Sequence, residues 1–168
     1  SGSTDESETV AAQYGARWFV NTDWQGYGVQ RQRAQALASG DYVLMLDADE
    51  QPDAALKAAI HAVAQQPPAP DRVYALRLRN IFCGTTMHRR YRDHIIRLYA
   101  RPHFHYHAYE VHESLARGNA TVTILDGDLL HFTNDNLAHF LAKNLRYSRD
   151  WALPESDSAD PRSYPAEF

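Results

Sequence analysis

The sequence has few of the features that would anchor it in a membrane or cross-link it covalently. Cys83 is the single cysteine, so no disulfide framework is expected, which suits a reducing compartment. No window approaches the roughly 18 apolar residues of a membrane-spanning helix. The chain does not open on a charged and then apolar signal segment. We therefore expect a cytoplasmic protein, soluble or held peripherally on the inner face of the cytoplasmic membrane.

The chain also lacks an excess of positive charge. Its formal net charge of -4 gives no global attraction for nucleic acid, which we set aside as a partner. An anionic ligand would have to be bound by local clusters of arginine and histidine. The 168 residues fit one domain, and 44% hydrophobic with 23% charged residues is typical of a globular protein. We find no internal repeat.

The first part of the chain alternates between helical and extended patterns. The spacing of apolar residues predicts helices over 5–14, 29–39 and 53–64, and strands over 16–20 and 42–46. This alternation predicts a parallel α/β sheet. The chain begins on a turn of small residues, a feature that normally follows a strand, so a first strand is expected to be missing ahead of Ser1.

The second part of the chain has a different pattern. Extended segments are predicted over 73–79, 94–99, 103–111 and 121–132, with few helical patterns between them. A helix is predicted over 137–151, followed by a loosely ordered tail rich in proline, serine and aspartate.

The strongest chemical signal is Asp47-Ala48-Asp49 at the carboxyl end of an apolar strand. Ligands of open α/β sheets bind at that edge. Two carboxylates one residue apart can hold magnesium or manganese and leave coordination positions free for diphosphate oxygens. Alternatively, the triplet merely ends the strand and caps the next helix. The motif alone does not decide between the two interpretations.

Two other enzyme classes use similar motifs. Phosphohydrolases that form an aspartyl phosphate place Asp-x-Asp after the first strand with a threonine nearby, whereas Glu50 and Gln51 follow the motif here. Gly26 and Gly28 make the start of a dinucleotide-binding pattern, yet Arg31 occupies the place of the third glycine.

The segments SGSTDES and WQGYGVQRQRAQALASGDYVLMLDADE, in this order and spacing, resemble the donor-binding half of inverting family 2 glycosyltransferases. More narrowly, they resemble the lipopolysaccharide-core branch. The resemblance implies a GT-A fold, with a parallel-rich, Rossmann-like sheet flanked by helices and a mixed acceptor-side half. Residues 1–66 would form the donor half and 67–151 the acceptor half with a C-terminal helix, with a tail over 152–168.

The resemblance also implies roles for particular residues. A UDP- or ADP-sugar donor would be bound by Ser3, Thr4, Asp5, Arg31 and Asp47. A Mg²⁺ or Mn²⁺ ion would be bound by Asp47 and Asp49. The chain departs from the family pattern at Gln32, where asparagine is usual.

The resemblance extends to about residue 150 through the blocks RLRNIFCGTTMHRRYRDHIIRLYAR, YEVHESL and GDLLHFTNDNLAHFLAKNLRYS. His131, at the end of an apolar run, is a candidate third metal ligand or diphosphate contact, or else a structural histidine. Glu113 is the candidate catalytic base, because inversion requires a group to take the acceptor proton. A surface glutamate at a strand end is the alternative interpretation. Asp93 is the reserve base, although by resemblance it orders the segment around Arg97.

Several basic groups could face an acceptor. Arg89, Arg90 and Arg92 lie in a predicted loop and suit acceptor phosphates or anionic lipid head groups. His103, His105 and His107 alternate, which places them on one face of a strand. Their spacing is compatible with a zinc site, but a solvated or acceptor-facing strand is favoured. The 137–151 helix permits contact with a membrane surface, while packing on its own domain is favoured.

Together these patterns predict a metal-dependent inverting glycosyltransferase of hexosyl or heptosyl type. It would move a sugar from a nucleotide-sugar to a lipopolysaccharide-core or similar glycan or lipid-linked acceptor. Two rival hypotheses remain open, a non-catalytic nucleotide- or sugar-binding remnant and a metal-dependent phosphohydrolase. An exposed sheet edge would also offer a site for homo-oligomer formation.

Overall fold

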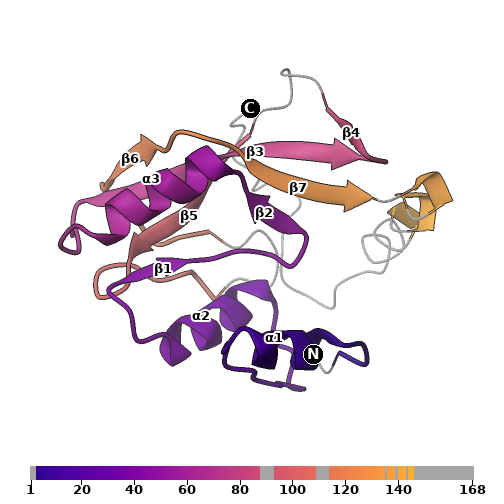
Figure 1. Cartoon of the computed structure of the whole chain (residues 1–168). Helices are drawn as coiled ribbons and strands as arrows, with labels where there is room; N and C mark the ends of the chain where they lie inside the picture. Colours follow the sequence, from indigo (N-terminus) through magenta and orange to yellow (C-terminus); the bar gives the residue numbers. More distant parts are fainter. Residues whose placement is uncertain are drawn as a thin grey trace, which may run out of the picture.

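The fold is built around one mixed β-sheet (Figure 1). The computed structural model describes residues 3–87, 93–108, 114–134, 136–138, 140–142 and 144–145. Within these residues the strand order is β1-β5-β3-β7-β2, with β4 and β6 also paired to β3. The strands are β1 (Tyr42–Leu44), β2 (Glu50–Pro52), β3 (Arg72–Phe82), β4 (Thr85–Thr86), β5 (His94–Ala100), β6 (Thr121–Ile124) and β7 (Leu129–Asn134).

The long strand β3 connects the two ends of the sheet. Its first half pairs antiparallel with β5 on one edge and parallel with β6 on the other, so Ala75 pairs with both Ile96 and Ile124. Its second half pairs parallel with β7, which in turn pairs antiparallel with β2. Because one strand belongs to both ends, residues at the end of β3 and in β2 and β7 are held in a single hydrogen-bonded frame.

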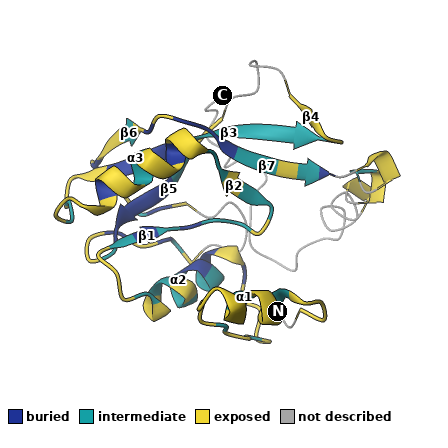
Figure 2. Ribbon diagram, in the orientation of Figure 1, coloured by how far each residue is buried: buried dark blue, intermediate teal, exposed yellow. Residues whose placement is uncertain are grey.

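Apolar side chains pack in two buried clusters against this sheet. Figure 2 shows the buried positions on β3 and β5 and on the sheet-facing side of α3. One cluster places α3 (Ala54–Ala64) on the sheet through Leu56 and Val63, which pack with buried leucines of three strands. The other cluster lies on the side of α2 (Tyr27–Leu37) and contains Val43, Tyr99 and Tyr106. Alternate residues of β3 point to opposite clusters, as the two-residue period of a strand requires.

The three helices predicted in the first part of the chain are confirmed, with small shifts at their ends, whereas much of the predicted 137–151 helix and the whole 152–168 tail lie outside the described residues. The confirmed helices are α1 (Ser7–Gln13), α2 and α3. Helix α3 begins after Asp53 because the Asp53 side chain accepts a hydrogen bond from the Leu56 backbone N–H at 2.7 Å. Helix α1 has no buried residue. None of the helices among the described residues is long and apolar enough to cross a membrane.

The strand predictions need four corrections. Of the predicted 103–111 strand, the described residues 103–108 form no strand, and Tyr106 makes an isolated bridge to Leu115. Residues 16–20 form no strand, and Phe19 and Val20 are more than half exposed, because an apolar segment becomes a strand only beside a partner that shares its hydrogen bonds. The predicted 121–132 strand is split into β6 and β7 by a turn at Gly127. Strand β1 was expected in a parallel sheet, yet within the described residues it pairs only with β5, in antiparallel orientation.

Candidate functional site

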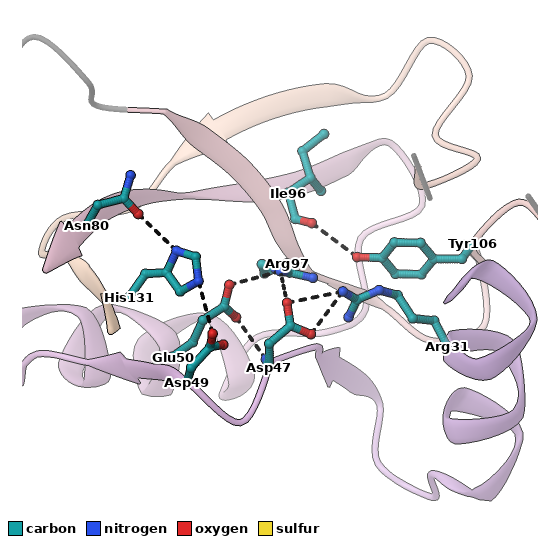
Figure 3. A network of polar contacts seen from close by, with 9 residues as sticks. All are labelled: Arg31, Asp47, Asp49, Glu50, Asn80, Ile96, Arg97, Tyr106 and His131. Carbon is teal, nitrogen blue, oxygen red and sulfur yellow. Dashed lines mark hydrogen bonds and ion pairs between the residues drawn. The ribbon is translucent and has the colours of Figure 1, made fainter. Parts of the chain in front are cut away.

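The loop that follows β1 is closed by its own acidic residues. The Glu50 backbone N–H donates to the Asp47 carbonyl at 3.0 Å, and the Asp47 backbone N–H donates to the Glu50 carboxylate at 2.9 Å. These reciprocal bonds fix the ends of the Asp47-Ala48-Asp49-Glu50 turn. The turn connects β1 to β2, so its side chains lie at the carboxyl end of β1 (Figure 3).

Two arginines hold the Asp47 carboxylate. Arg31 of α2 donates to its two oxygens at 3.0 and 3.3 Å, and Arg97 of β5 donates to Oδ2 at 2.6 Å. Arg97 also donates to the Glu50 carboxylate at 2.9 Å. Burial disfavours the charge on Arg97, but the neighbouring carboxylates outweigh it and raise the Arg97 pKa above its ordinary value. Arg97 is therefore a permanent cation that ties the turn to the sheet.

Asp49 has a different partner. Its Oδ2 lies 3.3 Å from Nε2 of His131, and Nδ1 of His131 lies 2.9 Å from Oδ1 of Asn80. Figure 3 shows the imidazole between the amide and the carboxylate. The Asp49 and His131 side chains are 42% and 24% exposed, so this end of the turn is open to a ligand.

Backbone pairing between β2, β7 and β3 places Glu50, His131 and Asn80 in one row across the sheet. His131 of β7 pairs with Glu50 of β2 on one side and with Asn80 of β3 on the other. The Phe132 backbone N–H donates to the Asp49 carbonyl at 2.9 Å, which extends the β2–β7 pairing back to Asp49. The row therefore depends on the register of three adjacent strands.

Helix α2 brings Arg31 to the site. The Arg31 guanidinium lies over the Tyr106 ring, 5.4 Å from its centroid, and the Tyr106 hydroxyl donates to the Ile96 carbonyl at 3.3 Å. Gln32, which departs from the family pattern, donates to the Tyr106 carbonyl at 2.6 Å. This glutamine helps to hold the 104–106 segment against the helix.

The predicted donor-binding turn lies apart from the acidic turn. Ser3, Thr4 and Asp5 are exposed, and an Asp5 oxygen accepts from the Ser7 backbone N–H at 3.1 Å. Hydrogen bonds from Ser7 lower the pKa of Asp5. An open depression along α1 begins at Asp5. Among the described residues, no hydrogen bond or ion pair joins this turn to Asp47, so its role in donor binding stays a prediction.

The structure describes only some of the other predicted residues. The candidate base Glu113 and the arginines Arg89, Arg90 and Arg92 lie outside the described residues. The reserve base, Asp93, is exposed, and its carbonyl accepts from the Leu78 backbone N–H at 2.8 Å.

The alternating histidines were expected on one face of a strand, but the described residues 103–108 form no strand. His103 and His105 are exposed, whereas the intervening Phe104 is buried. In the described parts of the chain, no three side chains of histidine, cysteine, aspartate or glutamate come together as metal ligands. The zinc interpretation of this segment is therefore not supported. Of the three predicted metal ligands, Asp49 and His131 face each other, whereas Asp47 is bound by Arg31 and Arg97.

Sequence reasoning missed Glu50, Arg97 and Asn80. Arg97 carried a usable signal, because it is the one charged residue inside the apolar run IIRLYA, and a buried guanidinium needs carboxylate partners. Glu50 adjoins the motif and was weighed only as a departure from another family. Asn80 carried no signal, because its contact with His131 depends on the pairing register of β3 and β7.

Residues 1–113 match the family model described as glycosyl transferase family 2. The match covers most of the chain, which therefore belongs to family 2 of the glycosyltransferases. Membership implies the GT-A fold, glycosyl transfer as the general activity, and a nucleotide-sugar donor and an acceptor as partners. In this chain the α/β architecture contains a mixed sheet, with both parallel and antiparallel strand pairs.

Proposed function

We propose that the chain is the catalytic part of a metal-dependent inverting glycosyltransferase. The donor would be a UDP- or ADP-sugar, and the acceptor a lipopolysaccharide-core or similar glycan or lipid-linked molecule. The observation that carries the metal dependence is the pair formed by Asp49 and His131. Asp49 is the one carboxylate of the turn whose partner is an imidazole, whereas Asp47 and Glu50 are both bound by arginine.

The carboxylate oxygen of Asp49 and the Nε2 atom of His131 are suitable ligands for Mg²⁺ or Mn²⁺. With the Asn80 amide placed so that Oδ1 faces Nδ1 of His131, Nδ1 is the donor, and a neutral ring then presents the lone pair of Nε2 to Asp49. Two lone-pair atoms 3.3 Å apart repel unless a cation or a proton lies between them. Adjacent ligands of an octahedral ion with bonds of roughly 2.1 Å are about 3 Å apart, close to the observed separation. A bound ion would neutralise charge on the departing diphosphate.

Residues outside the turn have supporting roles in this proposal. Arg31 and Arg97 neutralise Asp47 and Glu50 and hold the turn in place, so that Asp49 needs no rearrangement to meet the donor. Glu113 would take the proton of the attacking acceptor hydroxyl, and attack opposite the leaving group inverts the anomeric centre. Arg89, Arg90 and Arg92 would contact acceptor phosphates.

The test is metal-dependent transfer by an Asp49→Ala variant of the full-length protein. Transfer is measured from UDP- and ADP-sugars to a lipopolysaccharide-core acceptor, with Mn²⁺ or with a chelator. We expect the variant to lose transfer while its thermal unfolding temperature stays near that of the wild type, since Asp49 is partly exposed. Asp126→Ala is the matched control, because Asp126 is a fully exposed aspartate beside the sheet and should transfer normally.

Three other results would contradict the proposal. Unchanged turnover in Asp49→Ala would remove Asp49 from the reaction. Nucleotide binding without transfer in the wild-type protein would favour a binding remnant. Release of phosphate from simple esters, without any need for an acceptor, would favour a phosphohydrolase.

A further inference from the structure

The Asn80 side chain lies within hydrogen-bonding distance of Nδ1 of His131, the ring nitrogen that faces away from Asp49. Its amide oxygen lies 2.9 Å from Nδ1 of His131 (Figure 3). An amide oxygen can only accept a hydrogen bond, so this placement of the amide assigns the hydrogen to Nδ1. A neutral imidazole has one N–H, and the other nitrogen, Nε2, is then left as a lone-pair donor facing Asp49.

We propose that Asn80 is a positioning residue for divalent-cation binding, acting by holding His131 in the tautomer and ring orientation that direct Nε2 toward Asp49. The inference rests on the proposed function, because it assumes that Asp49 and His131 bind the metal. Without the Asn80 oxygen, the ring can place its hydrogen on Nε2, where it donates to the Asp49 carboxylate and occupies the lone pairs that the ion needs. The Asn80 amide therefore prevents the neutral His131 ring from donating a hydrogen bond to Asp49.

The backbone makes Asn80 suited to this task. It lies in β3, directly paired with His131 of β7, and its carbonyl accepts from the Met87 backbone N–H at 2.9 Å. Both residues are partly buried, which limits competition from water for the Nδ1 hydrogen. Hydrogen bonds to the second nitrogen of a metal-binding histidine commonly change metal affinity by roughly 10- to 100-fold when they are removed.

The tautomer is tested directly by long-range ¹⁵N–¹H correlation spectra of the metal-free protein in alkaline buffer. The His131 signals are assigned by their absence in His131→Leu. We expect the Nδ1–H pattern in the wild type and in Asn80→Asp, which keeps an oxygen acceptor at this position. We expect a shift toward the Nε2–H pattern in Asn80→Leu. An Nε2–H pattern in the wild type, or no change in Asn80→Leu, would overturn the inference whether or not the protein binds metal.

Metal affinity is tested by calorimetric titration of the same variants with Mn²⁺ alone. Asn80→Leu should bind Mn²⁺ at least tenfold more weakly than the wild type, and Asn80→Asp should stay within a few-fold of it. Thr133→Val is the matched control, because it removes a 3.2 Å hydrogen bond to the Ile81 carbonyl across the same two strands. It should leave Mn²⁺ affinity unchanged, so that a general loosening of β3 and β7 is excluded.

The two hypotheses fail in different ways. Wild-type affinity in Asn80→Leu, together with loss of binding in His131→Leu and Asp49→Ala, would overturn the role of Asn80 and leave the metal site standing. Mn²⁺ binding that survives both His131→Leu and Asp49→Ala would overturn the proposed metal site itself, and with it the part of the inference that concerns metal.

Discussion

Arg97 is the more deeply buried of the two arginines at the candidate site. Its side chain is 5% exposed and that of its partner Glu50 is 2% exposed. Arg97→Met keeps much of the volume but leaves Glu50 and Asp47 without the cation they share. Removing one partner of a buried ion pair costs about 3 kcal/mol or more, because the other charge stays desolvated. We expect this loss in the free energy of unfolding, measured by urea denaturation.

Arg33→Met is the matched control for that prediction. Arg33 pairs with Asp23 at 2.9 Å, the same distance that separates Arg97 and Glu50, but the two side chains are 32% and 64% exposed. An exposed ion pair is worth about 0–1 kcal/mol. Equal losses in the two variants would mean that burial of the Arg97 cluster has little energetic consequence.

At the residue scale, sequence reasoning found candidates for the site but not all of their partners. It singled out Arg31 and Asp47, which are in contact, and Asp49 and His131, which also are. Their roles in binding stay predictions. It could not find Asn80, because a side-chain contact between residues 80 and 131 follows from strand register and leaves no local pattern.

The turn between β6 and β7 is fixed to the beginning of α3. Asp53 accepts from the Asp128 backbone N–H at 3.0 Å and caps the helix with its other oxygen. Gly127 has φ +95°, and a Cβ there would lie 2.6 Å from Oδ1 of Asp53. Gly127→Ala therefore combines a strained backbone with a clash at the helix cap. We expect it to lower the free energy of unfolding by about 3 kcal/mol in urea denaturation.

Gly118→Ala separates the two causes. Gly118 also has a positive φ of +52°, but nothing lies within 4 Å of the added Cβ. Backbone strain alone should cost about 1 kcal/mol. If the two alanine variants were equally destabilised, the contact between the turn and α3 would contribute nothing.

At the scale of elements, the sequence predicted those features that depend on interactions between residues close together in the chain. The apolar period of α3 and the capping by Asp53 both lie within a few residues, and the helix was predicted to within one residue. The segment 16–20 has the composition of a strand, but composition does not supply a partner. The division of 121–132 was missed although Gly127 lies in it, since a glycine inside an extended run predicts a bulge as readily as a turn.

Stability should be distributed unevenly over the whole molecule. The first half of β3 pairs on both edges, and Val73 and Leu76 are fully buried. Helix α1 buries no residue. Amide hydrogen exchange should therefore be slowest in β3 and β5 and fastest in α1, which opens without exposing the core. Exchange in α1 as slow as in β3 would show that this helix is held by contacts other than those described here.

The overall fold could be predicted only in outline. The α/β class and the family follow from motif order along the chain, and the family match supports them. The antiparallel pairing of β1 with β5 joins residues 42–44 to 98–100, and no local pattern specifies such a distant pairing. It also means that strands from residues 1–66 pair with strands from beyond residue 67, so the predicted donor and acceptor halves share one sheet. Their separate functions stay a prediction.

The row formed by Glu50, His131 and Asn80 has a consequence for how such a protein can change. These residues are aligned by hydrogen bonds between neighbouring strands, not by the connections that join the strands along the chain. Insertions in those connections would leave the alignment intact, whereas a slip of one residue in β7 would turn His131 to the opposite face. The loops around this row can therefore vary in length without disturbing its alignment.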